Sequence, residues 1–507
     1  MKLMSLSIVK ENVIANFAGK ASTVVLSLIF IPVYIKLMGI EAYGIIGLFL
    51  SLTALLSILD MGLSSTLSRE LARLSISRDN DQEARDLLRT LEVVYWSIGI
   101  CLGLGLIALA PVIVRFWINP AGISPKTIEQ VLKIMGLVVA IQWPASLYSG
   151  GLMGLQRQVL LNGIKVGIAT IQHAGAVLLL LFISPSVVLF FAWQIVAGIA
   201  NILCLSLSLW KSLPSTSQKA IFKRYLINKN WKFAAGMTGI SIAVTILTQL
   251  DKIILSKLLS LTLFGYYTLA FTIANNISQL VGPFSSALFP KFSQMIITSK
   301  DDEISSLYHK ACQLVSIIVL PVASILILFS KDIISLWLSN ADVVENTHLL
   351  LSLLIIGSTI NALLTIPYTL QLAYGWTRLV FYQNVISIML VVPCMIFLTR
   401  AYGAVGAALV WIALNLAYLI VLIPIMHRRI LKAEMSKWYI IDTGFPLAVV
   451  LIISYISSIL RPADVSNIIS ASWIFATFIL ATSFAVMSLP FGRAWIVQHF
   501  NKELLIL

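Results

Sequence analysis

Four charged side chains interrupt long apolar stretches of the chain and are the first indication of chemistry. Lys20, Lys165, Asp251 and Lys252 each lie in a run of about 20 mostly apolar residues. One charged side chain at the centre of a membrane helix costs about 2.5–3.5 kcal/mol unless it faces water or a partner. Lysines that line a hydrated cavity can bind an anionic phosphate group as compact point charges. The three lysines are therefore candidate substrate-binding residues.

A structural role is the alternative for each of these residues. Lys20 and Lys165 each lie about two helical turns from one end of their stretch, so a long side chain can reach the interface by snorkelling. Asp251 and Lys252 can neutralise each other, although adjacent residues of a helix face each other poorly. An Asp in a cavity can also titrate and couple transport to a proton or another cation.

Further ionisable residues lie at the ends of the apolar stretches, where charge costs less. Asp60 and Arg69 lie near the end of the second stretch and in the loop after it, and Arg157 and Arg378 lie in two short turns. With Asp251, they are the candidate coupling or gating residues.

Amide side chains are more frequent within the apolar stretches than a lipid-facing surface tolerates. Hydrogen bonding between helices is the default role for any one of them, whereas their number favours a hydrated lumen suited to sugar hydroxyls. Asn275, Asn276 and Gln279 form the densest group, and Asn276 and Gln279 share a helical face. These three and Asn16 are further candidate substrate-binding residues.

Motifs of soluble enzymes are missing from the sequence. It contains no G-x-x-x-x-G-K-[ST], H-E-x-x-H or G-x-S-x-G pattern, and its five histidines and four cysteines are dispersed. We therefore expect no catalytic residues, metal or cofactor. Without an ATP-binding loop, uphill transport would need a partner or an ion gradient, so proton or cation coupling stays open.

The composition identifies the elements that must position these residues. Hydrophobic residues make up 59% of the 507 residues and charged residues only 11%, against about 25% charged in soluble domains. Apolar runs predict an all-α polytopic membrane protein of about 14 helices. They lie at 13–36, 40–63, 90–114, 131–153, 159–183, 186–210, 233–256, 263–289, 311–330, 349–373, 380–400, 403–426, 440–460 and 468–490.

The distribution of Lys and Arg predicts the orientation. Loops on one side hold 24 of the 35 basic residues and loops on the other side hold 8, so both termini are expected in the cytoplasm. Orientation also explains most of the net charge of +14, because the basic residues are spread over many loops rather than gathered on one face. Membrane lipids are the expected partners of these loops, and nucleic acid is not.

Recurring segments indicate an internal duplication. Gly154-Leu155-Gln156-Arg157 recurs as Gly375-Trp376-Thr377-Arg378, 221 residues later, and Tyr43-Gly44 recurs as Phe264-Gly265 at the same offset. Two lobes of six helices each, related by a pseudo-two-fold axis along the membrane normal, would explain the repeat.

The predicted parts of the chain follow from this duplication. We expect a first lobe at 1–210, a cytoplasmic linker containing an amphipathic helix at 211–232, a second lobe at 233–430, and a C-terminal helix pair with a cytoplasmic tail at 431–507.

Several segments together resemble a known family. They are Asn16-Phe17-Ala18-Gly19-Lys20, Leu59-Asp60-Met61-Gly62-Leu63, Gln249-Leu250-Asp251-Lys252 and Leu288-Phe289-Pro290-Lys291-Phe292-Ser293. The chain resembles Wzx-type O-antigen and exopolysaccharide flippases of the multidrug/oligosaccharidyl-lipid/polysaccharide exporter superfamily over about residues 10–430. Many members of this group have twelve helices, whereas fourteen is the number in the related peptidoglycan-precursor flippases.

The resemblance implies alternating access in the bacterial inner membrane, with an undecaprenyl-diphosphate-linked oligosaccharide as cargo. It supports Lys20 and Lys252 as diphosphate ligands, and it implies a polysaccharide polymerase and a chain-length regulator as partners. Two other functions are weighed against this one. A cation-coupled multidrug exporter of the same superfamily would prefer acidic cavity residues, and a membrane-embedded glycosyltransferase or polymerase would be expected to carry a large periplasmic loop.

Overall fold

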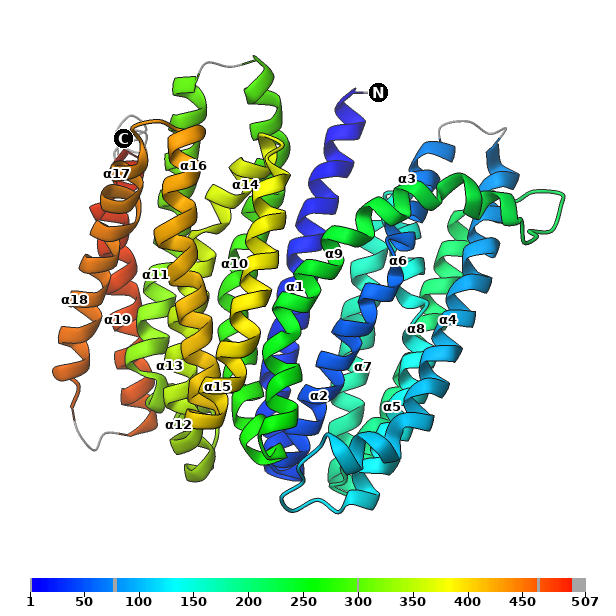
Figure 1. Cartoon of the computed structure of the whole chain (residues 1–507), viewed down its shortest axis with the longest axis horizontal. Helices are drawn as coiled ribbons and strands as arrows, with labels where there is room; N and C mark the ends of the chain where they lie inside the picture. The colour runs from blue at the N-terminus through cyan, green and yellow to red at the C-terminus, as the bar shows by residue number, and fades with distance from the viewer. Residues whose placement is uncertain (1, 76–79, 299–300, 463–465, 495–507) are drawn as a thin grey trace, which may run out of the picture. The chain divides into compact units, whose positions relative to one another are not determined.

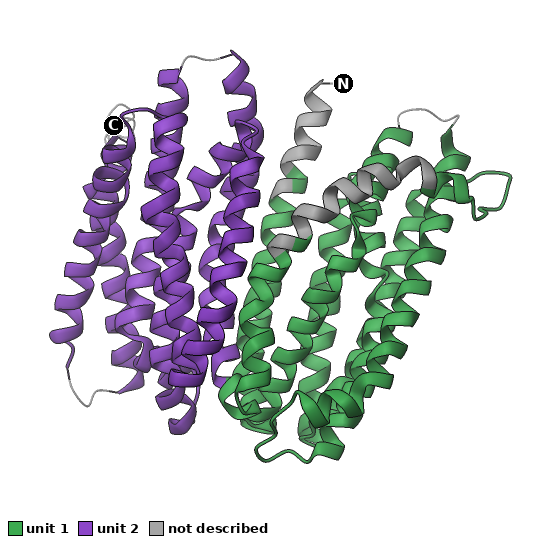
Figure 2. Cartoon of the chain, viewed as in Figure 1, with its two compact units in different colours: residues 1–265 green, residues 266–507 purple. Residues whose placement is uncertain are grey.

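The computed structural model describes residues 2–75, 80–298, 301–462 and 466–494, with the backbone alone for 2–10, 13, 228–241, 243 and 244. Every named element in these ranges is a helix, which confirms the predicted all-α architecture. By internal contacts the chain divides into two compact units, Met1–Gly265 (unit 1) and Tyr266–Leu507 (unit 2) (Figures 1 and 2). The predicted cytoplasmic tail beyond residue 494 lies outside the described residues.

Unit 1 contains nine α-helices, one short 3₁₀ helix and the start of α10 within the described ranges. They are α1 (Lys2–Met38), α2 (Ile40–Leu56), η1 (Ser57–Asp60), α3 (Leu63–Leu74), α4 (Asp81–Phe116), α5 (Pro125–Gln142), α6 (Ala145–Gly154), α7 (Gln158–Phe182), α8 (Val187–Ser212), α9 (Arg224–Leu258) and α10 (Leu261–Thr298).

Unit 2 continues from α10 with α-helices and two π-helical segments, η3 and η4. They are α11 (Asp301–Leu328), α12 (Ser330–Trp337), α13 (Ala341–Leu363), α14 (Thr365–Ala373), α15 (Thr377–Ala417), η3 (Tyr418–Leu422), α16 (Ile423–Arg429), α17 (Met435–Lys437), η4 (Trp438–Gly444), α18 (Phe445–Ile459) and α19 (Asn467–Ser488).

Eleven helical segments among the described residues are long and apolar enough to cross a membrane. One of them, Thr377–Arg429, joins two helices across Gly403, whose backbone is not helical. The 35-residue α9 and the 38-residue α10 also exceed the roughly 20 residues that a bilayer requires. The eleven segments become fourteen when α9 and α10 are added and Thr377–Arg429 is counted as two helices. This number, within the described ranges, equals the fourteen predicted helices.

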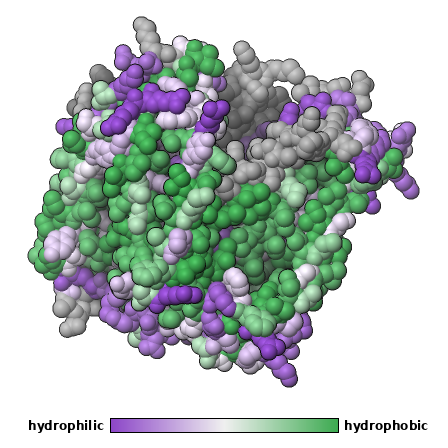
Figure 3. All heavy atoms as spheres, viewed as in Figure 1, coloured by the Kyte–Doolittle hydropathy of each residue, from purple (hydrophilic) through white to green (hydrophobic). Residues whose placement is uncertain are grey.

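Exposed side chains support the membrane assignment. On each unit, hydrophobic residues cover the middle of the helices and hydrophilic residues gather towards the helix ends (Figure 3). Leu104 and Phe397 lie within spans, and these residues are 60% and 72% exposed. Because a soluble protein rarely exposes such continuous apolar surface, these faces are expected to contact lipid.

Close packing of α4 on α5 depends on small residues. A Cβ atom added to Gly99 would lie 2.9 Å from Trp143 Cβ, and one added to Gly103 would lie 2.5 Å from the Gly136 carbonyl oxygen. Small residues spaced four apart let two membrane helices approach this closely.

The segment between α8 and α9 differs from the predicted amphipathic helix. Residues 213–223 are irregular and lie along α4, where the Ile221 amide donates to Asp86 Oδ1 over 2.9 Å and the Lys223 amide donates to Thr90 Oγ1 over 2.9 Å. Pro214 lies early in this segment and Arg85 donates to its carbonyl over 3.0 Å. Side chains of α4 therefore satisfy backbone groups that a helix would have satisfied internally.

The units do not divide where the predicted lobes do. Helix α9, predicted to open the second lobe, packs on α2, α3 and α4 of unit 1. Its end is held there because Trp117 Nε1 donates to Ser256 Oγ over 3.0 Å and Asn119 Nδ2 donates to the Lys257 carbonyl over 2.8 Å. The predicted lobes describe duplicated halves rather than contact units, and they stay a prediction.

Candidate functional site

A polar seam joins α1 and α7 of unit 1. Asn162 Nδ2 donates to Asn16 Oδ1 over 2.6 Å, and Asn16 Nδ2 donates to Gln158 Oε1. Further along both helices, Tyr34 lies against His173, with 2.9 Å between the tyrosine oxygen and Nδ1. Because residue numbers rise together along the two helices, α1 and α7 run parallel.

This register places Lys20 and Lys165 at about the same level. A Cβ atom added to Gly19 would lie 2.6 Å from Asn162 Oδ1, so Lys20 follows the point of closest approach and Lys165 lies one turn beyond Asn162. Both lysine side chains are exposed on unit 1. Among the described residues, neither ammonium group has a carboxylate within salt-bridge distance. The structure thus places two of the three predicted lysines at about the same level of the pair α1 and α7.

Asp251 and Lys252 form a neutral pair, although their adjacent positions in the helix predict poor geometry for it. Lys252 Nζ lies 3.0 and 3.1 Å from the two carboxylate oxygens of Asp251 and 3.1 Å from the Thr248 carbonyl oxygen. Only 10% of the Lys252 side chain is exposed. The geometric argument against the pair is wrong because the long lysine side chain folds back by one helical turn towards its neighbour.

The predicted amide group on α10 is not gathered into one network. Asn276 Nδ2 donates to the Thr272 carbonyl of its own helix over 2.9 Å. Asn275 is exposed and Gln279 is half-buried. The structure therefore accounts for one of these amides by a local hydrogen bond, and the binding role of the group stays a prediction.

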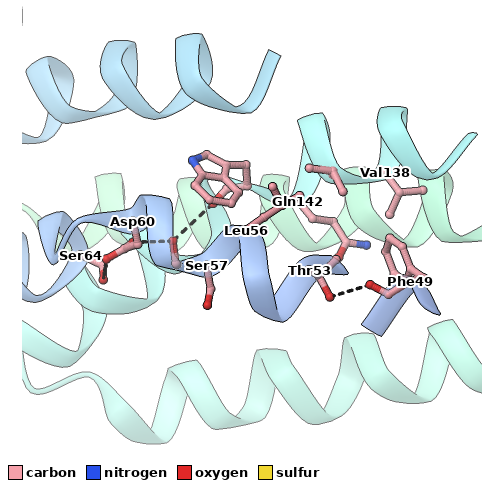
Figure 4. A pocket seen from close by; sticks show the side chains of 11 residues that line it. Phe49, Thr53, Leu56, Ser57, Asp60, Ser64, Val138 and Gln142 are labelled. Carbon is pink, nitrogen blue, oxygen red and sulfur yellow. Dashed lines mark hydrogen bonds between the residues drawn. The ribbon is translucent and has the colours of Figure 1, made fainter. Parts of the chain in front are cut away.

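Asp60 lies in a pocket of about 380 Å³ in unit 1 (Figure 4). Its Oδ2 accepts from Ser64 over 2.9 Å, and its Oδ1 accepts from Tyr95 over 2.5 Å and Ser146 over 3.2 Å. The pocket is lined by Phe49, Thr53, Leu56, Ser57, Asp60, Ser64, Val138, Val139, Gln142, Trp143 and Ser146.

This pocket combines an acidic group with the chemistry that sugars require. Trp143 and Phe49 supply aromatic surface, and Thr53 and Gln142 supply hydrogen-bonding groups. Trp143 Nε1 is buried without a hydrogen-bond partner among the described residues. Sequence spacing gave no signal for Tyr95 or Ser146, because both come from helices distant in the chain.

Two carboxylates that sequence reasoning missed are buried in unit 1. Helix α4 begins at Asp81 rather than near residue 90, so it contains Asp86 as well as Glu92. Glu92 Oε1 accepts from Tyr148 over 3.0 Å and from Trp210 over 2.8 Å. These contacts join α4, α6 and α8, which is a structural role.

The turns that carry Arg157 and Arg378 share one backbone pattern. In the first turn, the Leu155 amide donates to the Gly151 carbonyl, Gln156 to Met153, and Arg157 to Leu152. In the second turn, the Tyr374 amide donates to the Leu370 carbonyl, Gly375 to Leu372, and Trp376 to Gln371. Gln156 and Gly375 both have positive φ, at 58° and 70°. The turns therefore correspond at an offset of 219, which corrects the 221 inferred from matching letters.

The arginine candidates are surface residues. Arg69, Arg157 and Arg378 are all exposed, and none of them lines the Asp60 pocket. Their gating role stays a prediction. Groups of His, Cys, Asp and Glu able to hold a metal ion do not occur among the described residues.

Two units of long apolar helices, fourteen in all within the described residues, with buried charged and amide groups, define a polytopic membrane transporter fold. Solved structures share this fold at low identity. The lipid II flippase MurJ in an inward closed conformation matches with a TM-score of 0.65 and 13% identity, over 93% of this chain and 97% of that one. An inward-facing MATE family multidrug transporter matches with a TM-score of 0.63 and 13% identity, over 82% and 96%.

The family model described as polysaccharide biosynthesis protein matches residues 9–296, and the MatE model matches residues 237–398. The chain belongs to the polysaccharide biosynthesis protein family. The "Putative O-antigen transporter" of Shigella flexneri is 22% identical over 80% of this chain and 94% of its own. The lipopolysaccharide biosynthesis protein WzxC of Escherichia coli K12 is 23% identical over 44% and 45%. These relatives agree with the interpretation as a transporter rather than an enzyme.

Proposed function

We propose that this protein is a flippase that moves an undecaprenyl-diphosphate-linked oligosaccharide across the bacterial inner membrane by alternating access. The observation that carries the proposal is the placement of Lys20 and Lys165 at one level of the parallel pair α1 and α7, beside neutral amides and without carboxylate partners among the described residues. Family membership and the printed names of the relatives support the same class of cargo.

The two lysines suit a diphosphate better than a single charge. A ligand carrying two negative charges can gain charge-assisted hydrogen bonds from two exposed ammonium groups that lie at about the same level. The apolar surface of α1, which exposes Phe17 and Ile29, is suited to the polyprenyl chain. Lys252 is a weaker ligand candidate because Asp251 already neutralises it.

The polar seam between α1 and α7 and the Asp60 pocket offer sites for the sugars. Asn16, Gln158 and Asn162 provide donors and acceptors without net charge, and the pocket adds aromatic faces and hydroxyl groups. Proton or cation coupling through Asp60 or Asp251 remains part of this proposal.

A liposome experiment tests the proposal. Transbilayer movement of a fluorescent polyprenyl-diphosphate sugar is compared between wild type, Lys20→Ala, Lys165→Ala and the double variant. Each charge-assisted hydrogen bond contributes about 1.5–3 kcal/mol, so we expect each single loss to slow movement about tenfold or more. Lys20→Arg should retain most activity because the charge remains.

Lys133→Ala is the matched control, because Lys133 is an exposed span lysine that already pairs with Glu129 at 2.7 Å. Unchanged movement in the Lys20/Lys165 double variant would sink the binding proposal. Lys252→Ala is unsuitable as a primary test, since losing the cation beside the carboxylate of Asp251 can impair folding, and a folding defect would resemble a binding defect.

A cation-coupled drug exporter is the second candidate, because the Asp60 pocket presents a carboxylate beside aromatic rings. Organic cations are recognised by such groups. Efflux of a fluorescent organic cation from the same liposomes, abolished by Asp60→Asn, would favour this function over the flippase.

A further inference from the structure

Buried titratable residues gather at one point of unit 2, where α11 meets α17 and the π-helical segment η4. His309 and Asp442 are 3% and 0% exposed. The two nitrogens of the His309 ring face different carboxylates: Nδ1 contacts Asp442 Oδ2, and Nε2 lies 2.9 Å from Glu434 Oε2. One imidazole therefore lies between two acidic groups supplied by a single stretch of chain.

The hydrogen-bond requirement of this arrangement fixes its proton content. An ionised carboxylate only accepts hydrogen bonds, and a neutral imidazole donates from one nitrogen alone. With Glu434 and Asp442 both ionised, both contacts of His309 are hydrogen bonds only if both ring nitrogens carry a proton. The other oxygen of Asp442 accepts from Gln313 Nε2 over 2.8 Å.

Glu434 lies between two membrane spans and is also held in its ionised form. Burial raises its pKa, but hydrogen bonds from Ser305 and His309 outweigh that effect and hold the pKa of Glu434 below its usual range. Ser305 Oγ donates to Glu434 Oε1 over 3.0 Å. With both carboxylates ionised, the extra proton of the group belongs to the imidazole.

His427 provides a comparison in the same region. Its Nδ1 lies 2.9 Å from the Ile423 carbonyl oxygen, which can only accept, so Nδ1 carries the proton. Its Nε2 lies 3.2 Å from the Tyr308 hydroxyl, which can donate. One proton satisfies His427, whereas His309 needs two.

The surroundings add one further cation and a route to solvent. Lys437 Nζ lies 3.5 Å from Glu434 Oε2 at the rim. Tyr308, Cys312, His427 and Tyr439 are the other titratable groups packed around the site. Asp442 is fully buried, whereas 29% of the Glu434 side chain is exposed. A proton can therefore reach His309 from the Glu434 side.

The site lies where two π-helical segments meet. Asp442 belongs to η4, and Tyr439 of η4 donates from its hydroxyl to the Leu419 carbonyl of η3 over 2.5 Å. Ser316 of α11 donates to the Asp442 carbonyl over 2.6 Å. Single π-helical turns are rare and are frequently found at functional sites. The helix that leads into the C-terminal pair is thus attached to α11 through this cluster.

We propose that His309, Glu434 and Asp442 form a proton-binding site, and that the bound proton holds η4 and the C-terminal helix pair α18–α19 against α11. When the proton leaves, two carboxylates face one neutral ring and one of the two hydrogen bonds is lost. The site acts as a pH-dependent latch for the last two helices. It does not depend on the identity of the cargo.

Nitrogen NMR of the full-length protein, labelled with ¹⁵N-histidine in lipid nanodiscs, reads the proton directly. At pH 7.5 we expect one imidazolium with two protonated nitrogens, whose signals disappear in His309→Gln. His427 should show a neutral ring protonated at Nδ1, and its signals should disappear in His427→Gln. An unprotonated nitrogen on His309 at this pH would overturn the proposal.

The latch itself is tested by thermal unfolding between pH 6 and 9. Free histidine is neutral above about pH 6.5, so the folded protein binds more protons than the unfolded chain, and stability should fall as pH rises through this range. His309→Gln should remove this slope, whereas His348→Gln, a half-buried histidine of α13 outside the cluster, should retain it.

A slope in His309→Gln equal to that of wild type would contradict the latch. Glu434→Gln serves as the second variant if His309→Gln does not fold, because its side chain is partly exposed and its amide preserves the shape. The amide oxygen can still accept from the ring, but the pH slope should decrease because the ionised partner is gone. An undiminished slope in Glu434→Gln would also contradict the latch.

Discussion

Lys223 Nζ lies 2.6 Å from Asp86 Oδ2 and joins the irregular segment 213–223 to helix α4. Only 1% of the Asp86 side chain is exposed, so its charge depends on this partner and on the Ile221 amide. A buried carboxylate without a cation is strongly destabilising. The segment between α8 and α9 is therefore fixed to unit 1 by an ion pair.

Replacing Lys223 with Ala should lower the thermal stability of the protein and release this segment to proteolysis. The hydrogen bond to Asp86 raises the pKa of Lys223 above its ordinary value. Its contribution to stability is therefore complete at neutral pH and is lost as pH rises through the folded pKa. Unfolding temperatures measured from pH 7 to 11 in nanodiscs check this.

Lys219→Ala is the control, because Lys219 is exposed and contributes only its carbonyl oxygen, which accepts from Gln82 over 3.3 Å. Equal stability losses in the two variants would show that the ion pair is unimportant.

Gly154→Ala should destabilise unit 1 by about 1–3 kcal/mol, because an added methyl group has no space. Its Cβ would lie 2.3 Å from the Ser68 carbonyl oxygen, where α6 crosses the backbone of α3. Gly163→Ala is the control, since a Cβ there meets nothing within 4 Å. Chemical denaturation in mixed micelles measures both, and a Gly154→Ala variant as stable as Gly163→Ala would refute the close contact.

Gly403→Ala should cost about 1–3 kcal/mol for a different reason. Gly403 has φ 60° and ψ −140°, a conformation almost restricted to glycine, and it separates the two membrane spans merged in α15. Space is not limiting, because no atom lies within 4 Å of an added Cβ. Gly105→Ala, in open space within the regular helix α4, should be neutral in the same unfolding assay.

Asp60→Asn should slow flipping at least tenfold if the negative charge is part of coupling, while the fold is retained. The amide keeps an oxygen that can accept from Tyr95 and Ser146. Tyr95→Phe is the comparison, because it removes one hydrogen bond, worth about 0.6–1.7 kcal/mol in a membrane, and keeps the charge. Wild-type flipping in Asp60→Asn under an imposed pH gradient would exclude coupling through this residue.

The periodic apolar pattern predicted the helices well because lipid imposes one length on every span. Boundaries near the polar ends differ more. The predicted third helix begins at residue 90, whereas α4 begins at Asp81, so Asp86 was placed outside it, and the burial of Glu92 near its predicted start was missed. Tertiary hydrogen bonds from Tyr148 and Trp210 stabilise Glu92 there, and local hydropathy contains no trace of such partners.

The candidate site was predicted in part. Lys20 and Lys165 stood out because charge in an apolar stretch is costly, and the structure places them at one level. The pairing of Asp251 with Lys252 was misjudged because spacing rules describe Cβ directions and neglect the reach of a lysine side chain. The cluster around His309 was missed entirely, since His309 lies more than 120 residues from both Glu434 and Asp442 in the sequence.

The matching turns before α7 and α15 have a wider consequence. Each turn needs three backbone hydrogen bonds and one residue that tolerates positive φ, which Gln156 supplies in one copy and Gly375 in the other. Nothing in that requirement specifies a side chain elsewhere. Both turns connect their helices through the same backbone geometry. Each half of the chain can therefore change its charged side chains without disturbing how its helices connect.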